Sequence, residues 1–353
     1  MQKIPRLFSA LVFLTLLFAM PSLSEAAREP FWVVAHRGAS GYLPEHSSPA
    51  VALAHGFGAD FIEPDLILSK DGVLAVVHDV ILEESTNVAE IYPTRRRKDG
   101  HYYAIDFRWN ELKNLELRAR EPYLSKETKE SKDNSNRSSA QKEQLEWRFP
   151  KELNVSAMRI MSFEDYLNLV EGLNRSRNQN TKIIPELKEP EFHSKYGKDI
   201  VSAFFKVLKR HPYWGPENVV IQSFDPRTLM RIRTGKLFDG KLLQLIEFEN
   251  DGKGIDYVRM LTPEGLSEIA TYAEYVGPSL KSLFAMTPDG KIKGSEILKI
   301  LEKTSLKAIP YTHRTDQLPA IFDEEHLFKA IKRSSAIVGL FTDFPDRAIA
   351  YFR

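Results

Sequence analysis

The chain has 353 residues, of which 42% are hydrophobic and 27% are charged, and its formal net charge is +1. This composition is typical of a globular protein with a large core, and it excludes collagen-like, coiled-coil and intrinsically disordered chains. The near-zero charge argues against a nucleic-acid partner, and the absence of cysteine excludes disulfides, thiolate nucleophiles and cysteine-ligated metal sites.

The first 26 residues are typical of a secretory signal peptide. Lys3 and Arg6 precede the uninterrupted apolar run 7–20, and Ser24 and Ala26 supply small residues at the usual cleavage spacing. A retained membrane anchor is the alternative, but the run is shorter than the roughly 20 residues that span a bilayer. We therefore expect export, cleavage near Ala26, no stable membrane span afterwards, and a periplasmic or secreted location.

The remaining residues, 27–353, predict one α/β domain. Short apolar runs recur along them, and helical stretches follow most of these runs. We expect the runs to be parallel strands, because strands covered on both faces lack polar alternation. The predicted strands are Phe31–His36, Phe61–Leu66, Lys182–Leu187, Val219–Phe224, Lys241–Glu247, Tyr275–Leu280, Lys307–Thr312 and Gly339–Asp343.

Helix start signals lie between several of these strands. Pro49 follows Ser48 ahead of an apolar stretch. Ser162 and Asp165 have the spacing of a capping box. Eight strands with intervening helices in this length match a TIM (β/α)8 barrel. A doubly wound open sheet is the alternative, but no Gly-x-Gly-x-x-Gly motif follows the first strand.

The alternation is interrupted after the second predicted strand. Asp71-Gly72 is a turn signal, and 73–77 after it predicts an additional strand that returns along the second one. From about 84 to 161 the chain has no regular strand–helix rhythm. Residues 118–144 within this stretch are rich in Lys, Glu, Ser and Asn. We therefore expect an insertion here, with a surface excursion at its centre.

Charged residues cluster at the carboxyl ends of the predicted strands, where barrel enzymes place their functional groups. Glu63 and Asp65 are two residues apart on one strand, so they share a face, and Glu186 lies on the next predicted strand. Three carboxylates on one inner face repel each other unless a cation lies among them. Oxygen ligands favour Ca²⁺ or Mg²⁺ over zinc. The alternative is ion pairing with Lys188 and Arg37.

Two histidines, His36 and His78, close strands beside these carboxylates. Two imidazoles can divide the roles of proton acceptor and proton donor at neutral pH, or they can merely hydrogen-bond the acids. Arg37 and Lys188 suit a phosphate, as a guanidinium fork and a point charge. Together with a metal ion, these residues describe a site that cleaves a phosphodiester.

An ordered set of motifs in this chain resembles the glycerophosphodiester phosphodiesterases. The motifs are His36-Arg37-Gly38-Ala39, Pro44-Glu45, Glu63-Pro64-Asp65, Asp71-Gly72, His78-Asp79, Glu186-Leu187-Lys188, Gln222-Ser223-Phe224-Asp225, Pro310-Tyr311-Thr312 and the segment 339–346. The resemblance covers nearly all of 31–353 except the insertion. The C-terminal motifs and the signal-like N-terminus resemble the periplasmic bacterial branch.

The resemblance implies a TIM barrel that hydrolyses small-molecule glycerophosphodiesters to sn-glycerol 3-phosphate and an alcohol, with a small extra subdomain after the second barrel strand. It also implies that the glycerol 2-hydroxyl attacks phosphorus to give a cyclic phosphate. The cofactor that we expect is one divalent cation, and we favour Ca²⁺ over Mg²⁺. The implied roles are metal ligation by Glu63, Asp65 and Glu186, acid–base catalysis by His36 and His78, and phosphate binding by Arg37 and Lys188.

Two positions depart from the family pattern. His46 stands where many members have asparagine, and Tyr311 stands where others have tryptophan. We expect Phe224 and Tyr311 to contact substrate. Phe344 is a further aromatic candidate, with packing as the alternative for all three residues.

Two other functions stay open at this point. A secreted phospholipase D-like lipase on the same barrel would share the paired histidines and the acidic metal site, although such lipases usually contain disulfides. A non-catalytic surface binding protein would have lost part of the site, yet every expected polar position is filled. The sequence specifies neither the leaving alcohol nor the oligomeric state.

Overall fold

The computed structural model describes residues 31–118, 158–250, 252, 254–287, 291–317 and 324–353. These residues belong to one compact unit, Phe31–Arg353. The predicted signal peptide, and the predicted excursion beyond residue 118, lie outside the described residues. Within the described part of the chain, no helix is both long and apolar enough to cross a membrane.

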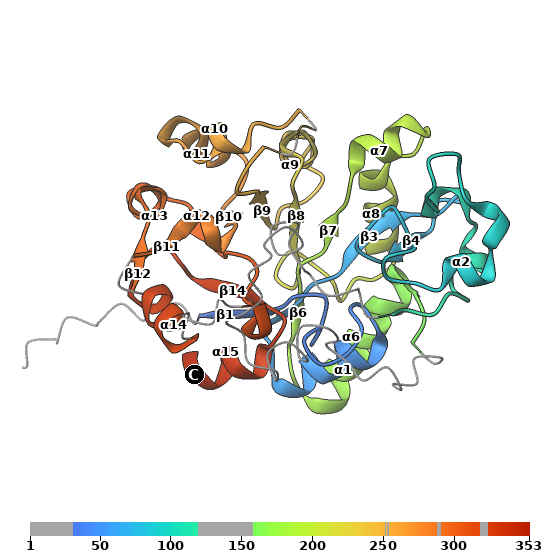
Figure 1. Cartoon of the computed structure of the whole chain (residues 1–353), viewed down its shortest axis with the longest axis horizontal. Coiled ribbons are helices and arrows are strands. Elements are labelled where there is room, and N and C mark those ends of the chain that lie inside the picture. Colours follow the sequence, from blue (N-terminus) through green and yellow to red (C-terminus); the bar gives the residue numbers. More distant parts are fainter. Residues whose placement is uncertain (1–30, 119–157, 251, 253, 288–290, 318–323) are drawn as a thin grey trace, which may run out of the picture. The chain divides into compact units, whose positions relative to one another are not determined.

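The strands pair in parallel in the order in which they follow one another along the chain (Figure 1). The strands of this parallel series are β1 (Trp32–Ala35), β2 (Phe61–Ile62), β3 (Asp65–Leu68), β6 (Lys182–Ile183), β7 (Glu186–Leu187), β8 (Val220–Ser223), β9 (Lys241–Ile246), β10 (Tyr275–Pro278), β13 (Lys307–Ala308) and β14 (Gly339–Thr342). β1 pairs with β2 on one side and with β14 on the other. The last strands meet through a parallel bridge between Ala308 and Ile337 and through the Phe341 N–H, which donates to the Pro310 carbonyl at 3.0 Å. The fold is the predicted TIM barrel.

Two of the predicted strands are each split into two segments. The second becomes β2 and β3, which flank Glu63 and Pro64, and the third becomes β6 and β7, which flank Ile184 and Pro185. Proline has no N–H to donate, so it interrupts a hydrogen-bond ladder. The two strands still meet across the breaks, because the Glu186 N–H donates to the Pro64 carbonyl at 2.9 Å.

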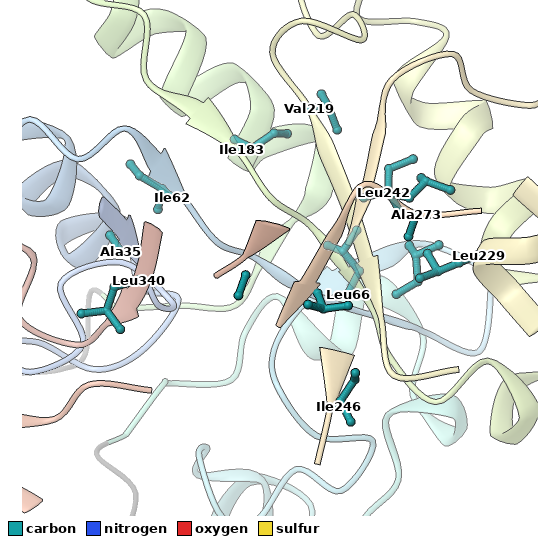
Figure 2. Packing of buried hydrophobic residues seen from close by; sticks show 14 of the residues in the cluster. Ala35, Ile62, Leu66, Ile183, Val219, Leu229, Leu242, Ile246, Ala273 and Leu340 are labelled. Atoms are coloured by element: carbon teal, nitrogen blue, oxygen red, sulfur yellow. The ribbon is translucent and has the colours of Figure 1, made fainter. Parts of the chain in front are cut away.

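Along β1, β2, β8, β9, β10 and β14, side chains alternate between two buried clusters. One cluster is the barrel interior, formed by Val34, Phe61, Ile184, Val220, Leu243, Leu245, Tyr275, Ile309 and Phe341. The other lies between the strands and the helices, and Figure 2 labels ten of its members: Ala35, Ile62, Leu66, Ile183, Val219, Leu229, Leu242, Ile246, Ala273 and Leu340. Because side chains alternate along a strand, a residue two positions beyond an interior residue also faces the interior, at the carboxyl end of the strand. We call this rule strand parity.

Helices follow most of the strands, and α1 and α6 begin at the two start signals that the sequence shows. The helices are α1 (Ser48–Phe57), α6 (Phe163–Arg177), α7 (Pro190–Lys195), α8 (Ile200–Leu208), α9 (Pro226–Thr234), α10 (Tyr257–Met260), α11 (Pro263–Ile269), α12 (Leu280–Leu283), α13 (Glu296–Leu301), α14 (Glu324–Arg333) and α15 (Pro345–Phe352). Ser162 caps α6 by accepting from the Asp165 N–H at 3.1 Å. The Asp165 carboxylate accepts from the Ser162 hydroxyl at 2.6 Å.

The predicted insertion has its own small core after the second barrel strand. The predicted returning strand is β4 (Leu74–Val76), which pairs antiparallel with β3 and with β5 (Met161–Ser162). The short helices that follow are α2 (Val88–Ile91), η1 (Pro93–Arg95), η2 (Ala104–Asp106) and α3 (Trp109–Leu112). A separate buried cluster holds them against β3 and β4, and Tyr102 and Phe107 are its largest members. Two observed features were not predicted from the sequence. One is the hairpin of β11 (Phe284–Met286) and β12 (Ile292–Gly294), and the other is the short helix η3 (Thr315–Gln317).

Candidate active site

A cavity of about 520 Å³ lies at the carboxyl ends of the barrel strands. Strand parity brings its polar residues together, because His36 lies two positions after the interior residue Val34, and Glu186 two positions after Ile184. Eight of the nine predicted site residues line the cavity: His36, Arg37, Glu63, His78, Glu186, Lys188, Phe224 and Tyr311. The ninth, Asp65, is 1% exposed and contacts several of them.

The three predicted metal ligands form one buried cluster. Glu63, Asp65 and Glu186 each offer an oxygen atom, and these atoms lie within 4.8 Å of one another. Burial and the Asp65 charge raise the pKa of Glu63 well above its usual value. Burial also raises the pKa of Glu186 to about 8, although Lys188 opposes this shift. Glu63 and Glu186 therefore resist ionisation beside Asp65 unless an opposite charge lies among them.

Asp65 differs from its two neighbours because it faces several cationic or hydrogen-bonding groups. Burial alone would raise its pKa, but Lys188, His78, His46 and Arg37 together hold the pKa well below its usual value. The Arg37 Nε lies 3.3 Å from Asp65 Oδ2. The ion pairs that were the alternative to a metal site are thus present at Asp65 and Glu186, while no lysine or arginine of the described residues pairs with Glu63.

The donor set of this cluster fits a hard divalent cation. Asp65 Oδ1 is buried and has no hydrogen-bond partner. Lys188 Nζ lies 3.1 Å from Glu186 Oε1 but 3.7 Å from Asp65 Oδ1, so it does not replace an ion at the centre of the cluster. A divalent cation there would lower the raised pKa values, because an opposite charge favours the ionised carboxylate.

Arg37 links the carboxylates to the rim of the cavity. Its backbone has a φ of 58°, in the left-handed region that non-glycine residues rarely adopt. In this conformation its N–H donates to Glu63 Oε2 at 2.8 Å, while its Nη1 donates to Glu45 Oε2 at 2.8 Å. Arg37 is 5% exposed and lines the cavity, where its guanidinium is suited to binding a phosphate.

His36 is held by a carboxylate from the last barrel strand. Its Nδ1 lies 2.6 Å from Asp343 Oδ1, and the other oxygen of Asp343 accepts from Arg314 Nε at 3.0 Å. Burial and the nearby Arg37 charge lower the pKa of His36 to about 4, although Asp343 opposes the shift. His36 is therefore neutral at pH 7, and its Nε2 is the nitrogen that this contact leaves for a substrate.

His78 is held in a similar way by the carboxylate of the next residue, Asp79. Its Nδ1 lies 2.6 Å from Asp79 Oδ1, and its Nε2 lies 3.1 Å from Lys188 Nζ. Burial and the charges of Arg37 and Lys188 lower the pKa of His78 to about 3. Burial would also lower the pKa of Lys188, but Glu186 and Asp65 outweigh it and raise that pKa. Lys188 is thus an ammonium group that donates to His78 Nε2.

The two predicted aromatic residues meet in the cavity wall. The rings of Phe224 and Tyr311 are perpendicular, with centroids 5.8 Å apart, and Lys188 Nζ lies 5.8 Å from the Phe224 centroid. Phe344 is 8% exposed and instead packs edge-on against Tyr42 at 5.2 Å. The structure thus places Phe224 and Tyr311 in the site and gives Phe344 a packing role.

Sequence reasoning missed the residues that hold the site residues in place. His46 Nε2 lies 2.9 Å from Asp65 Oδ2, and Gln222 Nε2 donates to Glu63 Oε1 at 3.3 Å. The Asp343 contact with His36 joins residues 307 positions apart. His46, Gln222 and Asp343 lie in or beside the motifs that carried the family resemblance, and this was the available signal. Their contacts could not be predicted from the motifs, because they depend on the closed barrel.

Comparisons with known proteins agree with this geometry. The model of the glycerophosphoryl diester phosphodiesterase family matches residues 36–347. The chain is 38% identical over 341 residues to the glycerophosphodiester phosphodiesterase of Haemophilus influenzae, covering 91% of this chain and 89% of that protein. It is 31% identical over 338 residues to the glycerophosphodiester phosphodiesterase of Treponema pallidum, covering 90% and 91%.

The fold is also found in a solved structure. A phosphodiesterase from Oleispira antarctica, in complex with the product sn-glycerol-3-phosphate, has a TM-score of 0.58 and 17% identity to this chain, and the match covers 91% of this chain and 96% of that one. The family match over nearly the whole described chain, and the two relatives above 30% identity, lead to one conclusion. The chain belongs to the glycerophosphoryl diester phosphodiesterase family.

Proposed function

We propose that this enzyme hydrolyses glycerophosphodiesters to sn-glycerol 3-phosphate and an alcohol, with one divalent cation as its cofactor. The observation that carries the proposal is the buried cluster of Glu63, Asp65 and Glu186 beside His36 and His78 in one cavity. Two relatives that are glycerophosphodiester phosphodiesterases by name support it. The product bound in the Oleispira antarctica phosphodiesterase supports the choice of sn-glycerol 3-phosphate.

The carboxylate cluster would hold the cation, and Arg37 and Lys188 would bind the phosphate. A bound divalent cation neutralises charge that develops on the non-bridging phosphate oxygens. The cation that we favour is Ca²⁺, because an all-carboxylate protein site suits its flexible coordination, whereas Mg²⁺ usually keeps several waters and binds one or two carboxylates.

The two histidines would move the protons. The glycerol 2-hydroxyl attacks phosphorus, and one imidazole accepts its proton. The bond from phosphorus to the leaving alcohol oxygen breaks, and the other imidazole, protonated for this step, gives that oxygen a proton. Water then opens the cyclic phosphate. Asp343 and Asp79 would fix the rings through Nδ1 of His36 and of His78. His36 Nε2 would then serve the substrate directly, and His78 Nε2 would do so once Lys188, which donates to it, turns to the phosphate.

Export is a further part of the proposal. Residues 1–26 would be removed as a signal peptide, and the mature enzyme would act in the periplasm of a bacterial envelope. The apolar run 7–20 supports this, and a chain without cysteine folds unchanged in an oxidising compartment. N-terminal sequencing of the mature protein checks it. A start near Ala27 supports export, and a retained Met1 contradicts cleavage.

The activity is tested with enzyme stripped of metal by EDTA. We expect release of sn-glycerol 3-phosphate from glycerophosphocholine only after Ca²⁺ is added back, because the carboxylates then hold the phosphate-binding cation. Glu63→Gln should need a higher Ca²⁺ concentration for half-maximal rate, and the control Glu249→Gln, an exposed carboxylate outside the cavity, should not.

The same assay separates the alternatives. Cleavage of lysophosphatidylcholine in preference to glycerophosphocholine would indicate the lipase. No metal-dependent release of sn-glycerol 3-phosphate would contradict the proposed hydrolysis and favour a binding protein.

A further inference from the structure

Arg314 follows β13 and lines the cavity, but it has no role in the proposed proton transfers. Its backbone is held in place on both sides. The preceding residue, His313, is fully buried, donates its N–H to the Phe341 carbonyl at 2.8 Å and accepts from the Asp343 N–H at 3.1 Å. On the other side, the Gln317 N–H donates to the Arg314 carbonyl at 3.1 Å. The Arg314 side chain therefore extends from a fixed segment of backbone.

The Arg314 side chain binds the same carboxylate that holds His36. Its Nε donates to Asp343 Oδ2 at 3.0 Å, and Asp343 Oδ1 lies 2.6 Å from His36 Nδ1. Asp343 therefore bridges the two side chains, and each of its oxygens has its own partner. A carboxylate that is bound through both oxygens cannot rotate without losing a contact, so its orientation is fixed.

The burial of this bridge makes its charges important. The Asp343 side chain is 2% exposed, and the Arg314 side chain is 20% exposed. A buried negative charge is costly unless a cation pairs with it. His36 is not that cation at pH 7, because burial and the Arg37 charge lower its pKa to about 4. Arg314 supplies the cation instead, since a guanidinium stays protonated throughout the physiological pH range.

The pairing of Arg314 with Asp343 lets His36 exchange protons. Without Arg314, the negative charge of Asp343 would be balanced most readily by a protonated His36. In the proposed reaction each imidazole takes up and releases a proton in every turnover, and an imidazolium held by an otherwise uncompensated carboxylate releases its proton poorly. With Arg314 present, Asp343 can orient the imidazole without keeping it charged.

We propose that Arg314 is a positioning residue for His36 and that it acts through Asp343. This inference rests on the proposed function and adds a residue to it. Arg314 holds Asp343 Oδ2 so that Oδ1 faces His36 Nδ1, and this contact fixes the direction of His36 Nε2. The role requires no contact between Arg314 and the substrate. Loss of Arg314 should therefore slow the chemical step more than it weakens substrate binding.

Steady-state kinetics of Arg314→Ala with glycerophosphocholine and Ca²⁺ tests this role. We expect kcat to fall by roughly 10- to 100-fold, the range found for residues that orient the histidine ligands of metal sites, and KM to change by less than about 2-fold. Arg314→Lys should retain part of the lost kcat, because lysine keeps a cation that can donate to Asp343. The control Arg175→Ala should keep the wild-type kcat, because the Arg175 side chain is 71% exposed on α6 outside the cavity.

The same substitution in an Asp343→Ala background shows whether Arg314 acts through Asp343. There it should lower kcat by less than about 2-fold, because the carboxylate that it holds is already gone. Each kcat is divided by the folded fraction from circular dichroism, so that misfolding is not counted as lost catalysis. A full loss in this background, a raised KM with unchanged kcat, or wild-type kinetics of Arg314→Ala would overturn the positioning role. Hydrolysis that is absent even from the metal-loaded wild type would instead contradict the proposed function itself.

Discussion

His36 and His78 illustrate how this site is built from single residues. Each imidazole lies 2.6 Å from a carboxylate through Nδ1, and each has a lowered pKa because it is buried beside cations. A neutral imidazole with one nitrogen fixed by an acid presents its other nitrogen in a defined direction. This arrangement suits a pair of groups that accept and return protons.

Removal of either imidazole should therefore abolish most turnover. We expect His36→Ala and His78→Ala each to lower kcat by about 10²–10⁴-fold, because each variant loses one proton carrier. The control is His101→Ala, since His101 is exposed and pairs with Glu83 outside the cavity. Steady-state kinetics with glycerophosphocholine measures the effect. Wild-type kcat in either cavity variant, with an intact circular dichroism spectrum, would refute the acid–base assignment.

The residues that meet in the cavity were predictable from the sequence, and the residues that hold them in place were not. Glu63, Asp65 and Glu186 could be grouped because their positions at strand ends follow from the sequence pattern. His46 and Gln222 could not be paired with Asp65 and Glu63, because these contacts depend on the three-dimensional register of neighbouring strands.

Among the secondary-structure elements, two prolines interrupt strands that the sequence predicts to be continuous. The sequence predicts continuous strands through Pro64 and Pro185, but both are split there because proline donates no hydrogen bond. The short helix α7 and the β11–β12 hairpin also have no counterpart among the predicted elements. Their sequences are short and lack a periodic pattern long enough to indicate a helix or a strand.

The helix α7 contains a buried histidine that should make the fold sensitive to acid. His193 is fully buried, and neither ring nitrogen has a hydrogen-bond partner. Burial, with a contribution from Lys198, lowers its pKa from 6.5 to about 4. The unfolded chain therefore binds a proton near pH 6.5 and the folded chain does not until about pH 4. The stabilisation is full above pH 6.5 and is lost as the pH falls towards 4.

Chemical denaturation at pH 7 and at pH 5 measures this effect. We expect the free energy of unfolding of the wild type to fall by about 2 kcal/mol more than that of His193→Leu between these two pH values. His326→Leu, a substitution at an exposed position of α14, serves as the control and should follow the wild type. An equal loss in the wild type and His193→Leu would exclude His193 as the acid-sensitive group.

In the whole molecule, closure of the barrel brings the residues of the site together. Its residues come from positions as far apart as His36 and Asp343, and only the return of the last strand to the first brings these two within 2.6 Å. The eight-strand pattern in the sequence predicted this closure, and the family comparison agrees with it. The predicted signal peptide at residues 1–26 lies outside the described residues and stays a prediction.

The proposed activity depends on one divalent cation among the carboxylates at the mouth of this barrel. A crystal structure of the protein grown with Ca²⁺ tests it most directly. We expect a single ion with oxygen atoms of Glu63, Asp65 and Glu186 at about 2.3–2.6 Å. An ion bound elsewhere, or a cluster that stays paired only with Lys188 and Arg37 at saturating Ca²⁺, would contradict it.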